Sequence, residues 1–188
     1  MNYKIHNEET VFDNHYKIKK AEVSYDSFAS GKVSATRFAF ERGDSVAILL
    51  YEKDTDSFLL TNQFRYPTTK HQKGWILEIP AGSLEVGETP EECVVREVEE
   101  ELGYAIAQPK HLFTFYTSPG GSTERMFLFY AETHSEQKTT KGGGKPDEQE
   151  DIQLVRLPRV DLVRKLNEFE DAKTIIAFQW FLLNHFNP

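Results

Sequence analysis

The stretch that decides the fold runs from Gly82 to Tyr104 and reads GSLEVGETPEECVVREVEEELGY. Its middle carries the start signals of a helix: Thr89 can act as N-cap, Pro90 suits the first helical position, and Glu92 completes a capping box. Gly103 then supplies the residue type that commonly ends a helix. We therefore expect one helix between Thr89 and Gly103, with a loop on each side.

This helix has two unlike faces. At about 100° per residue, the residues that share the apolar face are Val94, Val95, Val98 and Leu102. Glu97, Glu100 and Glu101 fall on the other face, where like charges repel and cost helix stability. A divalent cation with oxygen ligands would remove that penalty, and Arg96 can pair with Glu100 one turn later. A solvated acidic face is the plain alternative, and the helix taken alone does not decide between the two.

The same stretch resembles the signature of the Nudix hydrolases. The resemblance covers all 23 positions from Gly82 to Tyr104, and the one soft departure is Tyr104, where the family usually has an aliphatic residue. It implies a loop–helix–loop that binds Mg²⁺, or Mn²⁺ in its place, and hydrolyses a nucleoside diphosphate linked to another group. The positions implied as metal ligands are Glu97, Glu100, Glu101 and the backbone carbonyl of Ala81, and those implied as structural are Gly82, Arg96 and Gly103.

Beyond this box the resemblance narrows to the ADP-ribose and GDP-mannose hydrolase branch, over about Asn14 to Phe186. The segments that carry it are Glu41–Gly43, Gln63–Arg65, Glu78–Gly82, Ser118–Glu124 and Asp147–Ile152. The acidic segment implies Glu148 as the general base, with Glu150 as its rival or as an extra metal ligand. Solvation of an acidic loop is the plain alternative for both residues.

The substrate contacts implied by the branch lie elsewhere in the chain. Arg65 follows an apolar strand and could clamp a phosphate with two hydrogen bonds, unless it is a surface arginine. Arg37 and Glu124 match positions that contact substrate, sometimes across a dimer interface. Tyr16 matches a position that stacks on the base, although a core or edge-strand tyrosine explains it equally well.

Composition excludes several other classes of function. The chain has 188 residues, a net charge of −8 and one cysteine, which argues against a general nucleic-acid interface, a disulfide framework and a cysteine-rich zinc site. The longest apolar run, Thr174 to Leu183, is too short to span a bilayer. We therefore expect a cytoplasmic protein without membrane or nucleic-acid partners.

The strand and helix patterns predict an α/β protein, a Nudix α/β/α sandwich with a mixed sheet. An N-terminal hairpin is expected from the alternation in residues 16–26 and 33–40, and further strands in residues 45–51, 58–64, 112–117, 126–132 and 152–157. Residues 160–169 are expected to be helical, and an apolar helix is expected from Thr174. The glycine-rich segment 138–149 reads as a mobile surface loop. We expect residues 1–43 to form an arm that dimerises with a second copy, and residues 44–188 to form the Nudix domain.

The expected activity is Mg²⁺-dependent hydrolysis of the pyrophosphate bond of a nucleoside diphosphate sugar. ADP-ribose, giving AMP and ribose 5-phosphate, is the first expectation because residues 75–82 resemble that subgroup. GDP-mannose is the close alternative because Gly142–Gly144, Glu92-Cys93 and Gly103-Tyr104 resemble the other one. Hydrolysis of dinucleoside polyphosphates or RNA caps, and a sensor or RNA-binding module without catalysis, are rival interpretations.

Overall fold

The computed structural model describes residues 1–71 and 73–185 and contains two compact units. The first unit comprises Met1–Asp44 and Phe115–Arg125, and the second comprises Ser45–Thr114 and the chain from Met126 onward. The unit that contains the N-terminal arm thus also takes in an eleven-residue segment from the middle of the chain.

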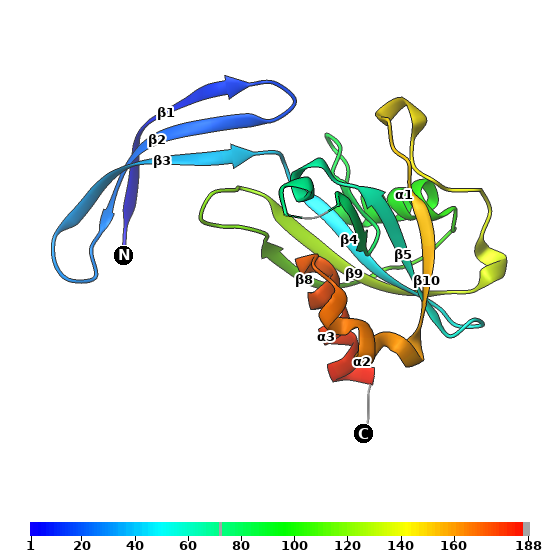
Figure 1. Cartoon of the computed structure of the whole chain (residues 1–188). Helices are drawn as coiled ribbons and strands as arrows, with labels where there is room; N and C mark the ends of the chain where they lie inside the picture. Colours follow the sequence, from blue (N-terminus) through cyan, green and yellow to red (C-terminus); the bar gives the residue numbers. More distant parts are fainter. Residues whose placement is uncertain (72, 186–188) are drawn as a thin grey trace. The chain divides into compact units, whose positions relative to one another are not determined.

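The first unit contains a three-stranded antiparallel sheet in the order β1-β2-β3 (Figure 1). Its strands are β1 (Tyr3–Asp13), β2 (Lys17–Asp26) and β3 (Lys32–Glu41). The predicted hairpin is present as β2 and β3, and Gly31 between them has a φ of 74°, which glycine adopts without strain. Strand β1 was not predicted, because register shifts at Ile5/Asn7 and Thr10/Phe12 break its alternation.

This sheet buries little of its own surface. Every residue of β1 is exposed, and none of the residues of β2 and β3 is fully buried. A short loop is attached to the end of β3, where the Phe40 N–H donates to the Gly121 carbonyl at 2.7 Å and the Thr123 N–H donates to the Phe40 carbonyl at 3.1 Å. These bonds place Glu124 in the same unit as the arm.

The second unit is built on a seven-stranded sheet whose main order is β10-β5-β4-β9-β8. The strands are β4 (Ser45–Glu52), β5 (Ser57–Phe64), β6 (Trp75–Glu78), β7 (Ala81–Ser83), β8 (Lys110–Tyr116), β9 (Arg125–Thr133) and β10 (Gln153–Pro158). Strand β4 runs parallel to β9 and antiparallel to β5 and β7, while β6 pairs with β5. The predicted mixed sheet is confirmed.

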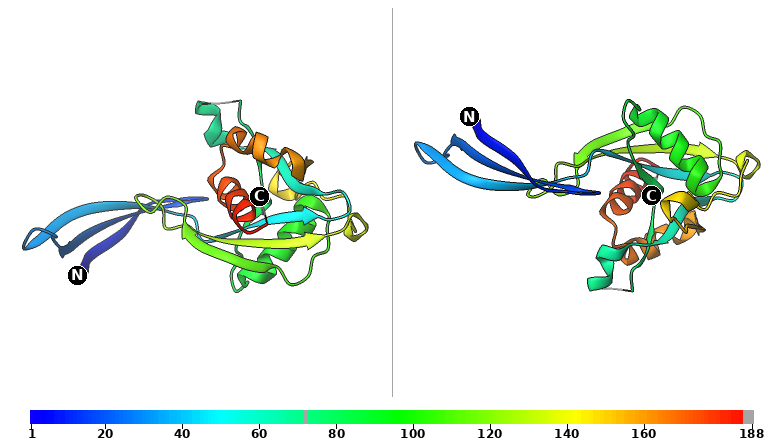
Figure 2. Two further views of the ribbon diagram at one scale, coloured as in Figure 1. Left: turned by 90° about the horizontal axis from the view of Figure 1, so that it is seen from below. Right: turned by 90° about the horizontal axis from the view of Figure 1, so that it is seen from above.

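Helices cover both faces of this sheet (Figure 2). Helix α1 (Pro90–Leu102) packs Val94 and Val98 against Val46 and Ile48 of β4 on one face. On the other face, α3 (Ala172–His185) places the ring of Phe178 5.1 Å from that of Phe58. The α/β/α sandwich is therefore present, and no helix in the described ranges is long and apolar enough to cross a membrane.

The sequence patterns missed the shortest elements. Strands β6 and β7 have four and three residues and are separated by Ile79 and Pro80, so neither is long enough to show alternation. The region predicted as a helix over residues 160–169 consists of the single turn α2 (Leu162–Lys165) between the short 3-10 turns Arg159–Asp161 and Leu166–Glu168. The helix predicted from Thr174 begins at Ala172.

Candidate active site

Helix α1 begins and ends as predicted. The Thr89 hydroxyl accepts the Glu92 N–H at 3.3 Å, and the Glu92 carboxylate accepts the Thr89 N–H at 2.9 Å, which completes the capping box. Gly103 ends the helix with a φ of 80°. These caps fix where α1 begins and ends, and the packing of Val94 and Val98 against the sheet sets the direction of its carboxylates.

Arg96 holds three of the acidic side chains of the box. Its guanidinium donates to Glu100 at 3.0 Å, which confirms the predicted pair, and also to Glu97 at 2.8 Å. Both carboxylate oxygens of Glu88 accept from Arg96, at 2.8 and 2.9 Å. The hydrogen bonds from Arg96 lower the pKa of Glu88 to about 2. Arg96 is therefore the main internal counter-charge of this acidic segment.

Glu101 carries its carboxylate into the interior. The residue is only 2% exposed, and its Oε2 atom accepts the N–H of Ala81 at 3.2 Å. Burial raises the pKa of Glu101 well above its ordinary range, and repulsion from Glu97 and Glu78 adds to the effect. The acidic face expected for α1 is thus not fully exposed, since the Glu101 carboxylate is enclosed between the helix and the start of β7.

Gly82 is needed because Glu97 lies against it. A Cβ atom at Gly82 would come within 1.9 Å of the Glu97 carboxylate, so a larger residue here would force that carboxylate out of its position. Burial raises the pKa of Glu97, Arg96 opposes the shift, and the nearby Glu100 and Glu150 reinforce it. The structural role inferred for Gly82 is a close approach between β7 and a carboxylate of α1.

The glycine-rich segment does not stand free of α1. The Gly143 N–H donates to the Glu101 carbonyl at 2.9 Å and the Gly144 N–H donates to the Glu100 carbonyl at 3.0 Å. Gly142, Gly143 and Gly144 have φ values of 65°, 106° and 84°, which side chains rarely adopt. The expectation of a loose loop is corrected: the segment caps the last carbonyls of the helix, which would otherwise lack partners.

The two candidate bases follow directly after these glycines. Glu148 lies in a 3-10 turn (Pro146–Glu148) with its side chain 57% exposed, and its Oε1 atom is 3.5 Å from the Lys145 ammonium. Glu150 is held more firmly, since its Oε2 atom accepts the Lys145 N–H at 3.0 Å. Its charge raises the pKa of both Glu97 and Glu101, which places Glu150 near the carboxylates of α1.

Arg65 belongs to an ion-pair network that the sequence did not reveal. Its Nε atom donates to Glu78 at 2.8 Å, and Lys173 of α3 pairs with the same carboxylate and with Asp171 at 3.0 Å. The side chains of Glu78 and Lys173 are only 4% and 11% exposed. A lysine at the start of an apolar helix faces an unfavourable helix dipole and needs an acidic partner, which is the signal that could have identified this network.

Tyr104, the departure from the family pattern, is fully buried. Its hydroxyl bonds to Glu52 and accepts from Arg156 at 2.7 Å, while Arg156 donates to Glu52 at 2.7 Å. Burial and the hydrogen bond to Glu52 raise the pKa of Tyr104 to about 12. The ring therefore fills the aliphatic position, and the buried hydroxyl has its own polar partners.

The remaining candidate residues lie in the first unit. The Tyr16 ring is 39% exposed and lies beneath the Arg42 guanidinium, 5.8 Å from ring centre to Cζ. Arg42 is 3.6 Å from the Glu124 carboxylate, so Tyr16 and Glu124 are linked through it. Arg37 donates to the Tyr25 hydroxyl at 3.1 Å, within the β2–β3 sheet.

The donor set of the second unit suits a hard divalent cation. Carboxylate and carbonyl oxygens are the ligands that such ions prefer, and the pKa values of Glu97 and Glu101 are raised by burial and by repulsion from neighbouring carboxylates in spite of Arg96 and Arg65. The side chains do not form a finished cage, since no group of three acidic, His or Cys residues converges within residues 1–71 and 73–185. Glu97 and Glu100 are instead turned towards Arg96.

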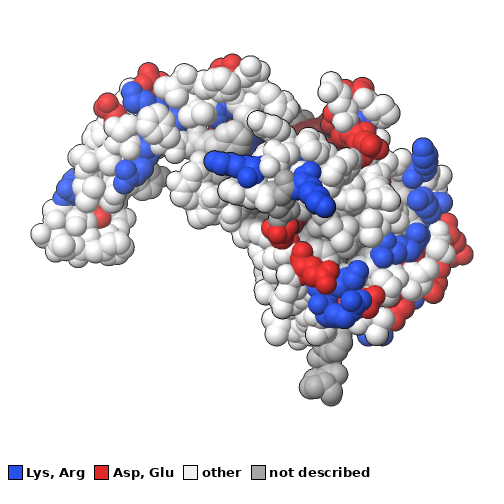
Figure 3. Space-filling model, in the orientation of Figure 1, with Lys and Arg blue, Asp and Glu red and all other residues white. Residues whose placement is uncertain are grey.

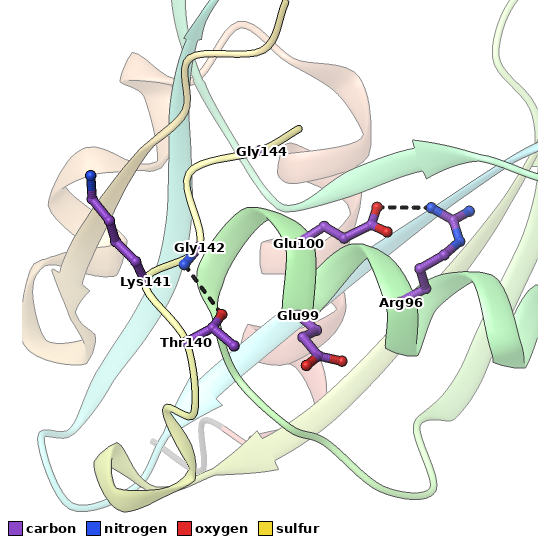
Figure 4. Close-up of a pocket in the computed structure, with 7 residues that line it drawn as sticks. All are labelled: Arg96, Glu99, Glu100, Thr140, Lys141, Gly142 and Gly144. Carbon is purple, nitrogen blue, oxygen red and sulfur yellow. Dashed lines mark hydrogen bonds and ion pairs between the residues drawn. The ribbon is translucent and has the colours of Figure 1, made fainter. Parts of the chain in front are cut away.

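A hollow of about 440 Å³ lies beside this acidic helix. It is lined by Arg96, Glu99 and Glu100 of α1 and by Thr140, Lys141, Gly142 and Gly144 (Figure 4). On the face drawn in Figure 3, Lys and Arg side chains occur in separate small groups and not as one continuous patch.

The mixed sheet between helices, with an acidic helix and a tethered glycine loop at one edge, defines an α/β protein with a carboxylate-rich site. The NUDIX domain family matches residues 41–178, so the chain belongs to the Nudix family. Proteins of this family are hydrolases that generally use divalent metal ions.

Similar proteins span nearly the whole chain. The GDP-mannose pyrophosphatase of Yersinia enterocolitica is 37% identical over 186 residues, which cover 96% of each chain. That of Pectobacterium atrosepticum is 40% identical over 153 residues, or 79% of this chain and 78% of its own. A crystal structure of an ADP compounds hydrolase shares the fold, with a TM-score of 0.74 at 19% identity over 98% of this chain and 97% of its own.

Proposed function

We propose that this protein hydrolyses the pyrophosphate bond of nucleoside diphosphate sugars, with GDP-mannose as its preferred substrate. The observation that carries the proposal is the 37% identity to a GDP-mannose pyrophosphatase across 96% of both chains. The sequence alone placed ADP-ribose first and GDP-mannose second. That order is therefore reversed here, and ADP-ribose becomes the comparison substrate. Hydrolysis of GDP-mannose at this bond would release GMP and mannose 1-phosphate.

Mg²⁺, or Mn²⁺ in its place, would be held by Glu97, Glu100, Glu101 and the carbonyl of Ala81. A bound divalent cation neutralises pyrophosphate oxygens and lowers the pKa of a bound water. Support comes from the burial of Glu101 and from the repulsion that raises its pKa, since a cation would remove both penalties.

The side chains of the protein would then position the substrate and deprotonate the attacking water. Glu148 would take the proton of the attacking water, because its exposed carboxylate can reach solvent and substrate, and Glu150 is the rival for this role. Arg65 would clamp a phosphate with the guanidinium nitrogens that Glu78 does not use, since only its Nε donates to Glu78. The ion pair to Glu78 would hold that guanidinium in place before the substrate arrives.

The working protein is proposed to be a homodimer in which the arm reaches the second copy. Support comes from the β1–β3 sheet, which has exposed apolar side chains and buries none of its residues fully. Apolar side chains left exposed together on a sheet favour packing against a partner surface. Arg37, Tyr16 and Glu124 would then contact the substrate from the arm unit. A cytoplasmic location also stays a prediction.

A comparison of kcat/KM values tests the substrate assignment. With Mg²⁺ present, we expect GDP-mannose to exceed ADP-ribose by about tenfold or more, and dinucleoside polyphosphates to be poorer still. A higher kcat/KM for ADP-ribose would reverse the assignment within the same class. If the protein hydrolysed dinucleoside polyphosphates or capped RNA but no nucleotide sugar, it would belong to another class of hydrolase. Binding of these ligands without any turnover would instead favour the interpretation as a sensor without catalysis.

A further inference from the structure

Lys145 connects the two acidic segments of the site. Its ammonium is 2.9 Å from Oε1 of Glu100 on α1 and 3.5 Å from Oε1 of Glu148 in the loop. The lysine and Glu100 side chains are 27% and 22% exposed, so the pair is only partly screened by solvent. A single flexible cation thus neutralises a candidate metal ligand and a candidate base.

The backbone of the same residue organises the loop. The Lys145 N–H donates to the Glu150 carboxylate at 3.0 Å, and the Lys145 carbonyl accepts the N–H groups of Glu148 and Glu150 at 3.1 and 3.2 Å. The preceding Gly144 is bonded to the Glu100 carbonyl, and a Cβ at Gly144 would come within 2.6 Å of the Glu150 side chain. The two candidate bases, Glu148 and Glu150, are therefore both held by contacts with Lys145.

Both oxygens of Glu100 are occupied by cationic side chains, but the two cations differ in their freedom to leave. Arg96 donates to Oε2 at 3.0 Å and is also fixed by two hydrogen bonds to Glu88. Lys145 occupies Oε1 from the end of a long, flexible stem, and Glu148 offers its ammonium another partner. A divalent cation that takes a Glu100 oxygen would thus displace Lys145 more easily than Arg96.

We propose that Lys145 is a counter-ion that releases the Glu100 carboxylate when the divalent cation binds, and that it positions the loop carrying Glu148 and Glu150. The proposal rests on the proposed role of Glu100 as a metal ligand. Lys145 is a positioning residue, since it acts on ligands and bases through ion pairs and backbone bonds. It competes with the metal for Glu100 and at the same time keeps the catalytic loop on the end of α1.

Titration of the full chain with Mn²⁺, without substrate, tests the competition. Free Mn²⁺ is measured by electron paramagnetic resonance for the wild type, Lys145→Met and the control Lys141→Met. Lys141 carries the same charge in the same loop, makes no salt bridge to any described residue, and points away from Glu100 in Figure 4. Lys145→Met should bind Mn²⁺ about three- to tenfold more tightly because the competing charge is gone, whereas Lys141→Met should stay within about twofold.

A merely structural role for Lys145 predicts the opposite result, because a loosened site would bind Mn²⁺ more weakly. Unchanged or weaker binding by Lys145→Met would overturn the proposal, and so would a wild type that binds no Mn²⁺. At saturating metal, we expect Lys145→Met to lower kcat with little change in KM and Lys145→Arg to retain most of kcat. An equal loss in both variants would also contradict it.

The two proposals fail in different ways. A wild type that binds Mn²⁺ but hydrolyses no nucleotide sugar would contradict the proposed function, while the Mn²⁺ titration would still decide the role of Lys145. An active Lys145→Met variant with wild-type Mn²⁺ affinity would contradict the role of Lys145 alone.

Discussion

Glu101 illustrates how a single residue can serve the reaction at the expense of stability. Its carboxylate is buried beside Glu97 and Glu78, and it accepts a hydrogen bond from the Ala81 N–H. A charge in such a place destabilises the folded chain unless a cation joins it. The proposed role of Glu101 as a metal ligand would supply that cation.

Glu101→Gln should therefore separate activity from stability. We expect hydrolysis to fall by several orders of magnitude, because the amide is a poor metal ligand. The metal-free variant should melt about 2 to 4 °C higher than the metal-free wild type, because a buried charge is removed without a change of volume. Steady-state kinetics and thermal unfolding in the presence of a chelator check both halves. Unchanged turnover would contradict the metal assignment.

Glu97→Gln should also abolish most activity, for the same loss of a ligand. It should keep the fold, since the glutamine still fits against Gly82 where the carboxylate now lies. Circular dichroism and kinetics with Mg²⁺ are the measurements. Wild-type rates in this variant would remove Glu97 from the metal site.

The base is identified by comparing two neighbouring glutamates. Glu148→Gln should lower kcat strongly with little effect on KM, because a base acts mainly in the transition state. Glu150→Gln should have the smaller effect on kcat, although its bond to the Lys145 N–H makes it part of the loop. If Glu150→Gln shows the large loss and Glu148→Gln none, the two roles are exchanged.

At the scale of elements, helix α1 was the part most fully predictable from sequence. Its capping box, its terminal glycine and its apolar stripe are local signals, and local signals survive folding unchanged. Strands β6 and β7 were not predictable because they are too short to show alternation, and β1 was not predictable because register shifts interrupt its pairing with β2. The Glu78–Lys173 pair and the attachment of the glycine loop to α1 were not predictable because they join residues far apart in the chain.

The ion pair that holds the start of α1 predicts a pH dependence of stability. Hydrogen bonds from Arg96 depress the pKa of Glu88 from 4.5 to about 2. A depressed pKa contributes stability that is fully present above the ordinary pKa and is lost as the pH falls towards the folded value. Glu88→Gln should therefore cost about 1 to 2 kcal/mol at pH 7.

The difference between the wild type and Glu88→Gln should shrink between pH 4.5 and about 2, where the wild-type carboxylate becomes protonated. Urea unfolding of both proteins at several pH values measures it. Glu91→Gln is the matched control, since Glu91 lies three residues further on, in the first turn of α1, and forms no ion pair with any described residue. A difference that stays constant with pH would show that the pair with Arg96 contributes little.

At the scale of the whole molecule, the proposed dimer predicts complementation. Arg37→Ala and Glu101→Gln are each expected to be nearly inactive alone. Arg37→Ala would lack the contact from the arm to the substrate, and Glu101→Gln would lack a metal ligand. After subunit exchange, each heterodimer would have one intact composite site, so roughly a quarter to a half of the activity should return. A monomer by light scattering, or no recovery despite confirmed heterodimers, would contradict the shared site.

Product identification distinguishes hydrolysis of the pyrophosphate bond from other cleavages of the nucleotide sugar. Phosphorus NMR of GDP-mannose incubated with the protein and Mg²⁺ should show the diphosphate signals replaced by those of GMP and mannose 1-phosphate. Glu101→Gln should leave the substrate intact under the same conditions. Release of GDP and mannose, or no change in the spectrum of the wild type, would contradict the proposal that the protein hydrolyses the pyrophosphate bond of GDP-mannose.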